Sequence, residues 1–470
     1  MNRFPHIFSR PAGGIVLVQF LATVALAAQP RPNILFILSD DLRPELSCYG
    51  AKAETPNLDR LAGSGVRFAN TWVQYPLCNP SRTSMLTGRY PTTTGALSNR
   101  NYFRDAYPDM VTLPQLFKNA GYDTIRIGKV FHDSADDPIS WTYGAARAVG
   151  APLPPNTYGP EQHRVNSDRI IILEGDGESH PDFKLASNAI FRLREYATSQ
   201  KPFFLTCGFS RPHSPLTAPK KWFDSVPLES ISLPPDFKPE ADAGPEFPAT
   251  ALPRNGDLFI KRKASEAEAK QMIQAYRASV RWVDWNTGRV LDTLRELGLD
   301  RNTIVIFWGD NGYHLGEKGK WSKHGSLFNL GVHVPLIMAG PGIVKGGTSP
   351  RVVQSLDIYP TLAELGGLTP PAGIEGRSLV PLLRSPTAAW PHAAYAVHHE
   401  GGKLNRAVRD ESFLYAEFDN GRSGAMLIDL KNDPLEQRNC LEKAEYREDL
   451  QRMKQLLGFL PTEAKVLPLY

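Results

Sequence analysis

The fold of this chain follows from one stretch near its start, Asn33-Ile34-Leu35-Phe36-Ile37-Leu38-Ser39-Asp40-Asp41. An unbroken apolar run with turn signals on both sides is typical of a parallel strand that is buried on both faces. A second run of this kind covers residues 303–308 and ends in Gly309-Asp310-Asn311-Gly312. Both predicted strands therefore end in side chains that carry oxygen donors.

Strand and helix patterns alternate around these two strands. Further strands are predicted at residues 121–129 and 201–209, and a helix begins at 56–61. An amphipathic helix is predicted at 275–297, where apolar residues recur near helical spacing at Val280, Val283, Val290, Leu291 and Leu294. This alternation predicts an α/β sheet with helices packed on both faces. Ligands bind beyond the carboxyl ends of such strands, so the two acidic strand ends are expected to share one site.

The remaining sequence predicts long loops and a second domain. Residues 134–169 and 214–255 are rich in Pro, Gly and polar residues and are expected to form loops at the rim of a pocket. The pattern changes near 385–391. Short strands are then predicted at 393–398, 404–409, 413–418 and 425–430, followed by a helix at 441–457. We expect a catalytic domain at 28–388 and a small antiparallel-sheet domain at 389–470.

Composition and the N-terminus indicate an exported globular protein. The 470 residues are 22% charged and 41% hydrophobic, and a net charge of +4 without a basic run gives no indication of a nucleic-acid partner. Arg3 and Arg10 precede an apolar stretch at 15–27, which predicts a signal peptide at 1–27 and a periplasmic or secreted protein. The stretch is short for a membrane span, although an uncleaved anchor is the alternative. The cysteines, at positions 48, 78, 207 and 440, leave room for one disulfide at most once Cys78 is set aside.

The run Cys78-Asn79-Pro80-Ser81-Arg82, followed by Thr83-Ser84-Met85-Leu86-Thr87-Gly88-Arg89, predicts a loop that leads into a short helix. Pro80 suits the first turn and Gly88 the end. A side chain at a helix start faces free backbone N–H groups, which favour an oxyanion, and Arg82 lies one turn further on the same face. Alone, Cys78 is more simply a small core residue. Its neighbours instead favour attack on an anionic ester by a group at position 78.

This motif resembles the Cys-x-Pro-Ser-Arg and Thr-Gly-Arg signature of type I sulfatases, within the alkaline phosphatase superfamily. The resemblance implies a large, mixed, mostly parallel sheet sandwiched by helices. It also implies that a formylglycine-generating enzyme oxidises Cys78 to formylglycine. One hydroxyl of the hydrated aldehyde then attacks sulfur, and deprotonation of the other expels sulfate. An ordinary Ser or Cys lacks this second route, because its carbon bears only one heteroatom.

Asp40, Asp41, Asp310 and Asn311 offer only hard oxygen ligands, which suit Ca²⁺ or Mg²⁺ better than zinc. Either pair alone is more simply explained by side chains that cap turns. The family's metal ligands match these positions, so the resemblance implies one Ca²⁺ ion, with Mg²⁺ less favoured and the modified residue 78 as a further ligand. A cation there would neutralise ester oxygens and polarise the attacking hydroxyl.

Three cationic blocks resemble further sulfatase motifs, namely Gly128-Lys129-Val130-Phe131-His132, Pro212-His213 and Gly319-Lys320-Trp321-Ser322-Lys323. By resemblance, Lys129 and Lys323 would bind sulfate oxygens. His213 would protonate the leaving alcohol, with Lys323 as a second candidate donor, and His132 would deprotonate the hydrate. Arg82 would hold residue 78. Each His, taken alone, is more simply a hydrogen-bonded loop or core residue.

The blocks Leu46-Ser47-Cys48-Tyr49-Gly50, 128–132 and Pro212-His213 look most like iduronate-2-sulfatases and their bacterial relatives, over residues 32–382. That branch acts on sulfated sugars, so a sulfated carbohydrate, uronate-containing or other, is the expected substrate. His314 is a candidate for the pocket wall. His398, His399 and Arg406 are candidates for contacts with the sugar, and are equally consistent with solvated surface.

Two other functions stay open from the sequence. A phosphate or phosphonate monoester hydrolase of the same fold often carries Ser or Thr as nucleophile, or two zinc sites with His ligands, and neither pattern is found here. A non-catalytic, exported glycan-binding protein would have Cys78 unoxidised. The retention of every polar residue of the predicted site argues against it, and a purely structural role would leave the acidic pairs and the three cations without a function.

Overall fold

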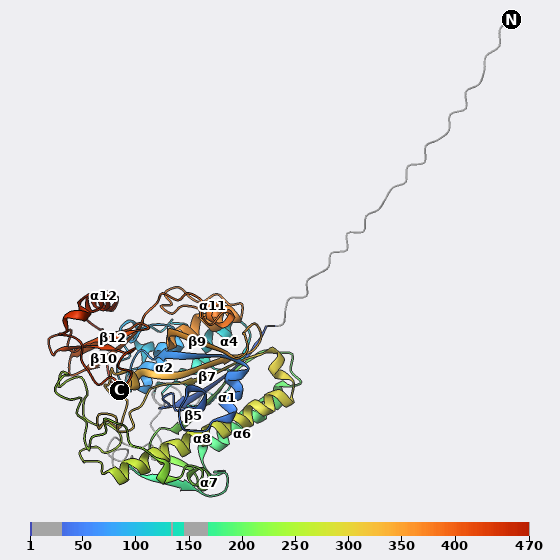
Figure 1. Cartoon of the computed structure of the whole chain (residues 1–470). Helices are drawn as coiled ribbons and strands as arrows, with labels where there is room; N and C mark the ends of the chain where they lie inside the picture. Colours follow the sequence, from blue (N-terminus) through green and yellow to red (C-terminus); the bar gives the residue numbers. More distant parts are fainter. Residues whose placement is uncertain (2–30, 133–134, 145–167, 470) are drawn as a thin grey trace. The chain divides into compact units, whose positions relative to one another are not determined.

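The first apolar run forms strand β1, Asn33–Asp40, inside a seven-stranded sheet (Figure 1). Its side chains alternate between two hydrophobic clusters: Ile34, Phe36 and Leu38 belong to one, and Leu35 and Ile37 to the other. Successive strand residues point to opposite faces of a sheet. A strand covered on both faces has no polar side, which is why this segment is apolar without interruption.

The computed structural model describes residues 1, 31–132, 135–144 and 168–469. The chain divides into Met1–Pro30 and Arg31–Tyr470, and all described elements belong to the second part. Apart from Met1, the predicted signal peptide at 1–27 lies outside the described residues, as does most of the predicted loop at 134–169. Among the described helices, none is both long enough and apolar enough to span a membrane.

The strand order in the large sheet is β3-β5-β1-β7-β8-β2-β9. Every adjacent pair is parallel except β7 with β8 and β8 with β2, so the sheet is mixed and mostly parallel, as expected. The other strands of this sheet are β2 (Gly65–Trp72), β3 (Asp123–Gly128), β5 (Phe203–Pro212), β7 (Thr303–Gly309), β8 (His333–Ala339) and β9 (Gly347–Gln354).

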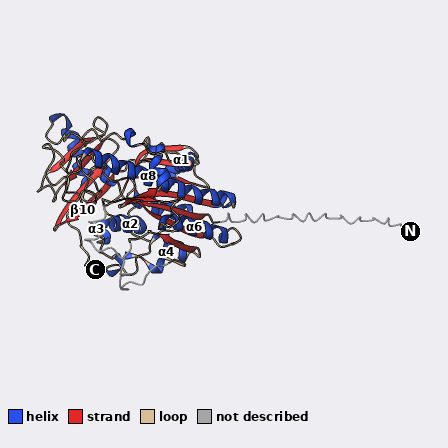
Figure 2. Ribbon diagram, turned by 90° about the horizontal axis from the view of Figure 1, so that it is seen from below, coloured by secondary structure: helices blue, strands red, loops and turns tan. Residues whose placement is uncertain are grey.

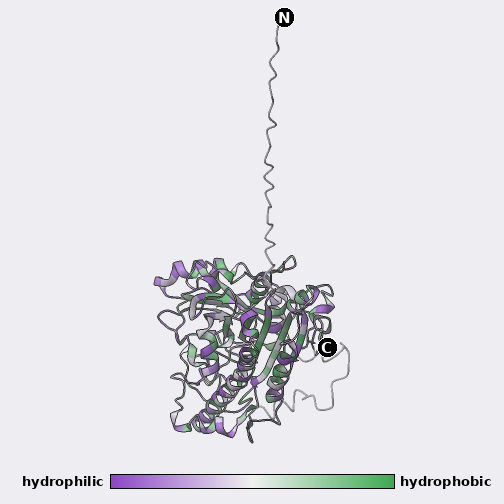
Figure 3. Ribbon diagram, turned by 90° about the vertical axis from the view of Figure 1, so that its right-hand side faces the viewer, coloured by the Kyte–Doolittle hydropathy of each residue, from purple (hydrophilic) through white to green (hydrophobic). Residues whose placement is uncertain are grey.

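Helices cover both faces of this sheet (Figures 1 and 2). One cluster holds residues of α2 (Cys78–Thr87), α4 (Leu113–Asn119), α10 (Ile358–Leu365) and α11 (Val380–Arg384). The other holds residues of α1 (Pro56–Gly63), α6 (Pro181–Tyr196) and α8 (Glu266–Glu296). The strands between them are drawn mostly in the hydrophobic colour in Figure 3, as a doubly covered sheet requires.

Two expectations about the middle of the chain need correction. The predicted loop at 214–255 contains a strand, β6 (Leu216–Pro219), and a helix, α7 (Lys220–Asp224). β6 pairs in parallel with β4 (Ile170–Leu173) and packs on α8. These partners are distant in sequence, so the short segment itself gives no strand signal. Helix α8 begins at Glu266, nine residues before the predicted start, behind a capping box of Ser265 and Glu268.

The C-terminal region forms the predicted antiparallel sheet, in the order β10-β11-β12-β13. Its strands are β10 (Ala394–Glu400), β11 (Lys403–Arg409), β12 (Phe413–Glu417) and β13 (Ala425–Asp429), and α12 (Arg447–Leu457) packs against it. The helix begins six residues later than predicted. The Val397 N–H of β10 donates to the Gln74 carbonyl at 2.9 Å, which joins this sheet to the segment before Cys78. The domain boundary at 388 stays a prediction.

Short helices complete the described elements. They are α3 (Pro91–Thr94) and α9 (Asn329–Val332), with 3-10 turns at Ser47–Tyr49, Phe103–Asp105, Pro138–Ser140, Leu228–Ser230, Leu299–Asn302, Ser355–Asp357 and Ala444–Tyr446.

Candidate active site

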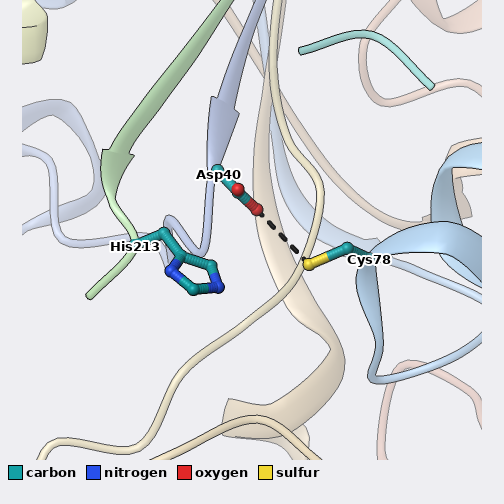
Figure 4. A group of neighbouring side chains, drawn as sticks. All are labelled: Asp40, Cys78 and His213. Atoms are coloured by element: carbon teal, nitrogen blue, oxygen red, sulfur yellow. Dashed lines mark hydrogen bonds between the residues drawn. The ribbon is translucent and has the colours of Figure 1, made fainter. Parts of the chain in front are cut away.

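Four neighbouring parallel strands bring polar residues to one edge of the large sheet. β1 ends at Asp40, and Lys129, His213 and Asp310 directly follow β3, β5 and β7. Since these strands run in the same direction, their carboxyl ends lie at the same edge, where open α/β sheets bind ligands. Figure 4 shows Asp40 at the end of its strand, with Cys78 and His213 close to its carboxylate.

Three carboxylates form the centre of the site. One oxygen each of Asp40, Asp41 and Asp310 lies within 4.8 Å of the other two. Asp41 has a φ of 61°, a left-handed conformation that is uncommon for a non-glycine residue. This turn departs from strand alternation and lets two successive carboxylates reach one site. The conformation is held by hydrogen bonds from the Asp41 N–H to Asp310 Oδ1, at 2.9 Å, and from the Tyr276 hydroxyl to the Asp41 carbonyl, at 2.6 Å.

The donor set fits a hard divalent cation. Asn311 Nδ2 lies 3.4 Å from Asp41 Oδ1 and 3.5 Å from Cys78 Sγ. Its amide oxygen Oδ1 is buried and has no hydrogen-bond partner in the part of the chain that the structure describes. A buried acceptor of this kind is costly unless a ligand satisfies it. With the three carboxylates it makes the all-oxygen set that Ca²⁺ or Mg²⁺ prefers.

Cys78 lies beside this acidic cluster. It is the first residue of α2, is 1% exposed, and has its Sγ 3.4 Å from Asp40 Oδ1. Atoms of Asp40, Cys78 and His213 all lie within 4.8 Å of one another. The helix ends at Thr87, just before Gly88, which the sequence predicted as its end and which has a left-handed φ of 64°. Burial raises the pKa of the Cys78 thiol well above its ordinary value.

Arg82 ties α2 to the strand ends. Its guanidinium is fully buried, and Nε donates to Asp310 Oδ2 at 2.7 Å. Nη1 donates to the Lys129 carbonyl at 2.7 Å, and Nη2 lies 3.6 Å from Asp40 Oδ1. One side chain therefore contacts the segments that follow β3 and β7 and the end of β1. The planar fork of arginine suits such divided contacts better than the single ammonium of lysine.

Three further cationic or titratable groups surround the carboxylates. Lys129 Nζ lies 2.5 Å from Asp40 Oδ2, and Lys323 forms an ion pair with Asp41. His213 Nε2 lies 3.7 Å from Asp41 Oδ2, while its Nδ1 donates to the Ser214 carbonyl at 2.8 Å. The structure thus brings together the predicted cations Arg82, Lys129, His213 and Lys323.

Burial and charge compete in setting the pKa values of the carboxylates. Burial alone would raise the pKa of Asp40, but the charges of Lys129 and His213, followed by that of Arg82, hold it well below the ordinary value. Burial raises the pKa of Asp41 to about 6 against the opposing charge of Lys323. It raises the pKa of Asp310 to about 6 against that of Arg82. Carboxylates with such different values lie within one cluster, as is common at functional sites.

The remaining predicted residues have varied surroundings. His132 follows three residues after Lys129, and its carbonyl accepts a hydrogen bond from the Ala135 N–H at 2.7 Å. His314 is 1% exposed, with Nε2 2.8 Å from Ser326 Oγ, and burial holds its pKa well below the ordinary value. The proposed roles of these two histidines stay predictions.

The predicted sugar contacts all lie on the C-terminal sheet, and one of them lines a cavity. His398 lines a cavity of about 320 Å³ whose other lining residues are Thr250, Pro253, Gly325, Glu400, Gly401, Lys403, Asn405 and Ser423. Gly325 lies two residues after Lys323, so the cavity borders the loop that carries this lysine. His399 donates its backbone N–H to the Tyr75 hydroxyl at 2.9 Å, and Arg406 forms an ion pair with Glu417. Their roles in binding also stay predictions.

Sequence analysis missed two buried residues beside the site. Asp257 lies two residues after the predicted loop at 214–255, and Tyr313 follows the Asp310 loop. Tyr313 donates its hydroxyl to Asp257 Oδ2 at 2.6 Å. An Asp-Asn-Gly-Tyr sequence signals a turn, but nothing in it indicates that the tyrosine contacts a carboxylate 56 positions earlier.

All four cysteines are free thiols.

Comparisons with known proteins agree over most of the chain. A family model described as Sulfatase matches residues 32–368, and one described as N-sulphoglucosamine sulphohydrolase, C-terminal, matches 316–462. A sulfatase of Formosa agariphila is 36% identical, over 91% of this chain and 86% of its own length. Iduronate 2-sulfatase of Homo sapiens is 34% identical, over 72% of this chain and 70% of its own length.

Solved structures share the fold. A protein in complex with its substrate D-glucosamine-2-N,6-O-disulfate has a TM-score of 0.72 and 25% identity, covering 91% of this chain and 97% of its own. The phosphonate monoester hydrolase of Silicibacter pomeroyi has a TM-score of 0.74, covering 91% and 94%. Its identity is 21%, so this second likeness concerns the fold alone.

Proposed function

Because this chain belongs to the sulfatase family, we propose that it hydrolyses the sulfate ester of a sugar through a nucleophile made from Cys78. One observation carries the proposal: Cys78 Sγ lies 3.4 Å from Asp40 at a helix start, beside three clustered carboxylates and the lysines that pair with them. An anionic ester needs this combination of a nucleophile with positive charge around it. Relatives named for iduronate and glucosamine sulfates support a sugar substrate.

The nucleophile is formylglycine, formed from Cys78 by a dedicated maturation enzyme. The Cys-x-Pro-Ser-Arg motif at 78–82 supports this oxidation, and the buried thiol itself is a poor nucleophile because its raised pKa keeps it protonated. The hydrated aldehyde would supply one hydroxyl to attack sulfur and a second whose deprotonation releases sulfate. Arg82 donates hydrogen bonds to Asp310 and to the Lys129 carbonyl, and so holds the helix that carries residue 78 against the strand ends.

The other residues bind the ester and move protons. Lys129 and Lys323 bind sulfate oxygens, and His213 gives a proton to the leaving alcohol from Nε2, with its ring oriented by the Nδ1 hydrogen bond. His132 accepts the proton of the hydrate. A single Ca²⁺, held by Asp40, Asp41, Asp310 and Asn311, would neutralise charge on the sulfate. Mg²⁺ is the less favoured ion.

The substrate pocket and the cellular location are further parts of the proposal. The sugar occupies the cavity of about 320 Å³ lined by His398, where Glu400, Lys403 and Asn405 offer polar contacts. His399, Arg406 and His314 are the remaining candidates for its walls. The predicted signal peptide supports a periplasmic or secreted enzyme. In either location the enzyme would have access to polymeric sulfated carbohydrates.

One experiment tests the main steps. The full chain is produced with and without a formylglycine-generating enzyme, the peptide that contains residue 78 is weighed, and sulfate release is measured on 4-nitrophenyl sulfate and on sulfated uronate and glucosamine oligosaccharides. We expect activity only in the oxidised protein, with Cys78→Ala inactive in both preparations. Treatment with EGTA should remove the activity, and added Ca²⁺ should restore it.

Three results would contradict this function in different ways. A fully active protein with an unmodified thiol would overturn the nucleophile. Hydrolysis of phosphate or phosphonate monoesters alone would indicate the rival enzyme class. Binding of sulfated oligosaccharides by fully oxidised protein, without release of sulfate, would indicate a glycan-binding protein.

A further inference from the structure

We propose that Asp257 is a positioning residue that holds His213 in place through Ser214. The inference rests on the proposed function, in which His213 protonates the leaving alcohol. Asp257 is buried at 6% exposure and comes from the segment between α7 and α8, which contributes no other residue to the mechanism. It therefore adds to the site a carboxylate that neither binds the ester nor belongs to the acidic cluster.

Ser214 connects Asp257 to His213. The Ser214 hydroxyl donates to Asp257 Oδ1, and the carbonyl of the same residue accepts the hydrogen bond from His213 Nδ1 at 2.8 Å. A ring whose Nδ1–H is held by a carbonyl presents Nε2 in a fixed direction. Here Nε2 lies 3.7 Å from Asp41 Oδ2, on the side of the acidic cluster. The orientation of the imidazole thus depends on where Asp257 holds Ser214.

The second oxygen of Asp257 fixes it to the loop that follows β7. Tyr313 donates its hydroxyl to Asp257 Oδ2 at 2.6 Å, and its ring stacks on Tyr276 with centroids 5.7 Å apart. Tyr276 in turn donates to the Asp41 carbonyl at 2.6 Å. One carboxylate therefore links the loop after β5, which carries His213, to the residues that hold the left-handed turn at Asp41.

Residues on both sides of Asp257 are hydrogen-bonded to Trp321. Asn255 Oδ1 accepts the Trp321 N–H at 2.8 Å, and the Leu258 N–H donates to the Trp321 carbonyl at 3.2 Å. Trp321 precedes Lys323 by two residues. Asp257 is thus attached to the segment that carries Lys323. This attachment fixes the distance between His213 and Lys323.

The dependence of the rate on the leaving group distinguishes this role from general support of the fold. A proton donor matters most when the departing oxygen is strongly basic, and least when it leaves readily as an anion. Phenyl sulfate has the more basic leaving oxygen and 4-nitrophenyl sulfate the less basic one. Displacement of His213 should therefore affect the two esters unequally, whereas partial unfolding reduces both rates by the same factor.

The test uses the oxidised full-length protein with Asp257→Asn and Ser214→Ala, singly and combined. We expect Asp257→Asn to lower kcat/KM for phenyl sulfate by about 10- to 100-fold and for 4-nitrophenyl sulfate by no more than about threefold, with the change mainly in kcat. Ser214→Ala should show the same selectivity. The double variant should lose little more than either single one, because both act through one connection.

Asp284→Asn is the matched control. Asp284 is also a buried carboxylate, 2% exposed, and accepts the Leu58 N–H at 2.8 Å, between α8 and α1. Its replacement should leave the ratio of the two rates unchanged. Equal losses on both esters in Asp257→Asn, or no loss, would overturn the inference. If Asp257→Asn fails to fold in thermal melts, Ser214→Ala decides by the same criterion. Oxidised wild-type protein that hydrolyses neither ester would instead overturn the proposed function.

Discussion

Lys129 and Lys201 form ion pairs of equal length in different surroundings. Lys129 Nζ lies 2.5 Å from Asp40 Oδ2, with the two side chains 14% and 2% exposed. Lys201 Nζ lies 2.5 Å from Asp123 Oδ1, but its side chain is 52% exposed. A pair at the surface contributes little, because water screens it. A cation beside buried carboxylates acts in a medium where charge is screened less.

Lys129→Ala is therefore expected to abolish most of the activity, and Lys201→Ala to leave it intact. Loss of one charge that stabilises the transferring sulfate should lower kcat/KM by about 100-fold or more. The measurement is sulfate release from 4-nitrophenyl sulfate by oxidised protein, with folding followed by circular dichroism. Equal activity of the two variants would show that Lys129 is only a structural partner of Asp40.

At this scale the sequence predicted which residues come together better than it predicted their individual contacts. The predicted site residues Cys78 and Lys129 both lie beside Asp40, because motifs fix residue type and spacing. Arg82 was expected to hold residue 78, and its shortest hydrogen bonds go to Asp310 and the Lys129 carbonyl. Those atoms come from distant segments, and no local pattern encodes such a meeting.

Strands β3 and β5 approach closely where Gly208 faces the backbone of Lys129. The Lys129 N–H donates to the Gly208 carbonyl at 3.0 Å, and a Cβ on Gly208 would lie 2.0 Å from the Lys129 carbonyl oxygen. Any side chain there must push the two segments apart. A Cβ on Gly63, at the end of α1, would meet no atom within 4 Å, so this glycine provides a natural contrast.

Gly208→Ala is expected to destabilise the protein by about 1–3 kcal/mol and to reduce activity, since it displaces the lysine of the site. Gly63→Ala should be neutral or stabilise by up to about 1 kcal/mol, because alanine favours helix. Urea unfolding and sulfate release measure the two effects. A Gly208→Ala protein with wild-type stability would mean that the segments separate without cost.

The success of prediction differed among the elements for physical reasons. β1, β5 and β7 were found because strands covered on both faces are apolar throughout. β2 and β9 were missed, since their partly exposed residues, such as Arg67 and Arg351, interrupt the apolar pattern. The start of α8 was missed although Ser265 and Glu268 form a capping box, a signal that the sequence does contain.

A buried carboxylate joins the C-terminal region to the rest of Arg31–Tyr470. Glu436 accepts the Asn329 N–H at 2.9 Å, and Asn329 Oδ1 accepts hydrogen bonds from Arg409 at 2.6 Å and from Trp72 at 2.8 Å. These contacts bring β2, α9 and β11 together. Burial raises the pKa of Glu436 from 4.5 to about 7.

Stability is therefore expected to fall as the pH rises toward neutrality. Between pH 4.5 and about 7 the folded protein keeps a proton on Glu436 that the unfolded chain has released, so the free energy of unfolding decreases with pH. The slope contributed by one group is at most about 1.4 kcal/mol per pH unit. Glu436→Gln lacks this titration. Between pH 5 and 8 its free energy of unfolding should therefore decrease by about 1–3 kcal/mol less than that of the wild type.

Denaturant unfolding at both pH values tests this prediction, with the exposed Glu229→Gln as control. The free energy of unfolding of Glu436→Gln relative to wild type should change with pH. The free energy of unfolding of Glu229→Gln relative to wild type should not. Parallel pH profiles for all three proteins would mean that Glu436 is ionised in the fold at pH 5.

The alternation of strands and helices predicted the architecture of the whole molecule, but not the order of the strands. β8 runs antiparallel between β7 and β2, an arrangement set by packing of the complete sheet. The prediction of the mixed sheet came from the family resemblance and is confirmed. Pairing across hundreds of residues has no counterpart in local composition.

The reactive residues are scattered along the chain, from Asp40 on the first strand to Lys323. A nascent polypeptide leaving the ribosome therefore lacks part of the site until about two thirds of its residues have been translated. A fragment that ends just before Lys323 contains Asp40, Cys78 and Lys129 but lacks the cation that pairs with Asp41, so it cannot assemble the complete site.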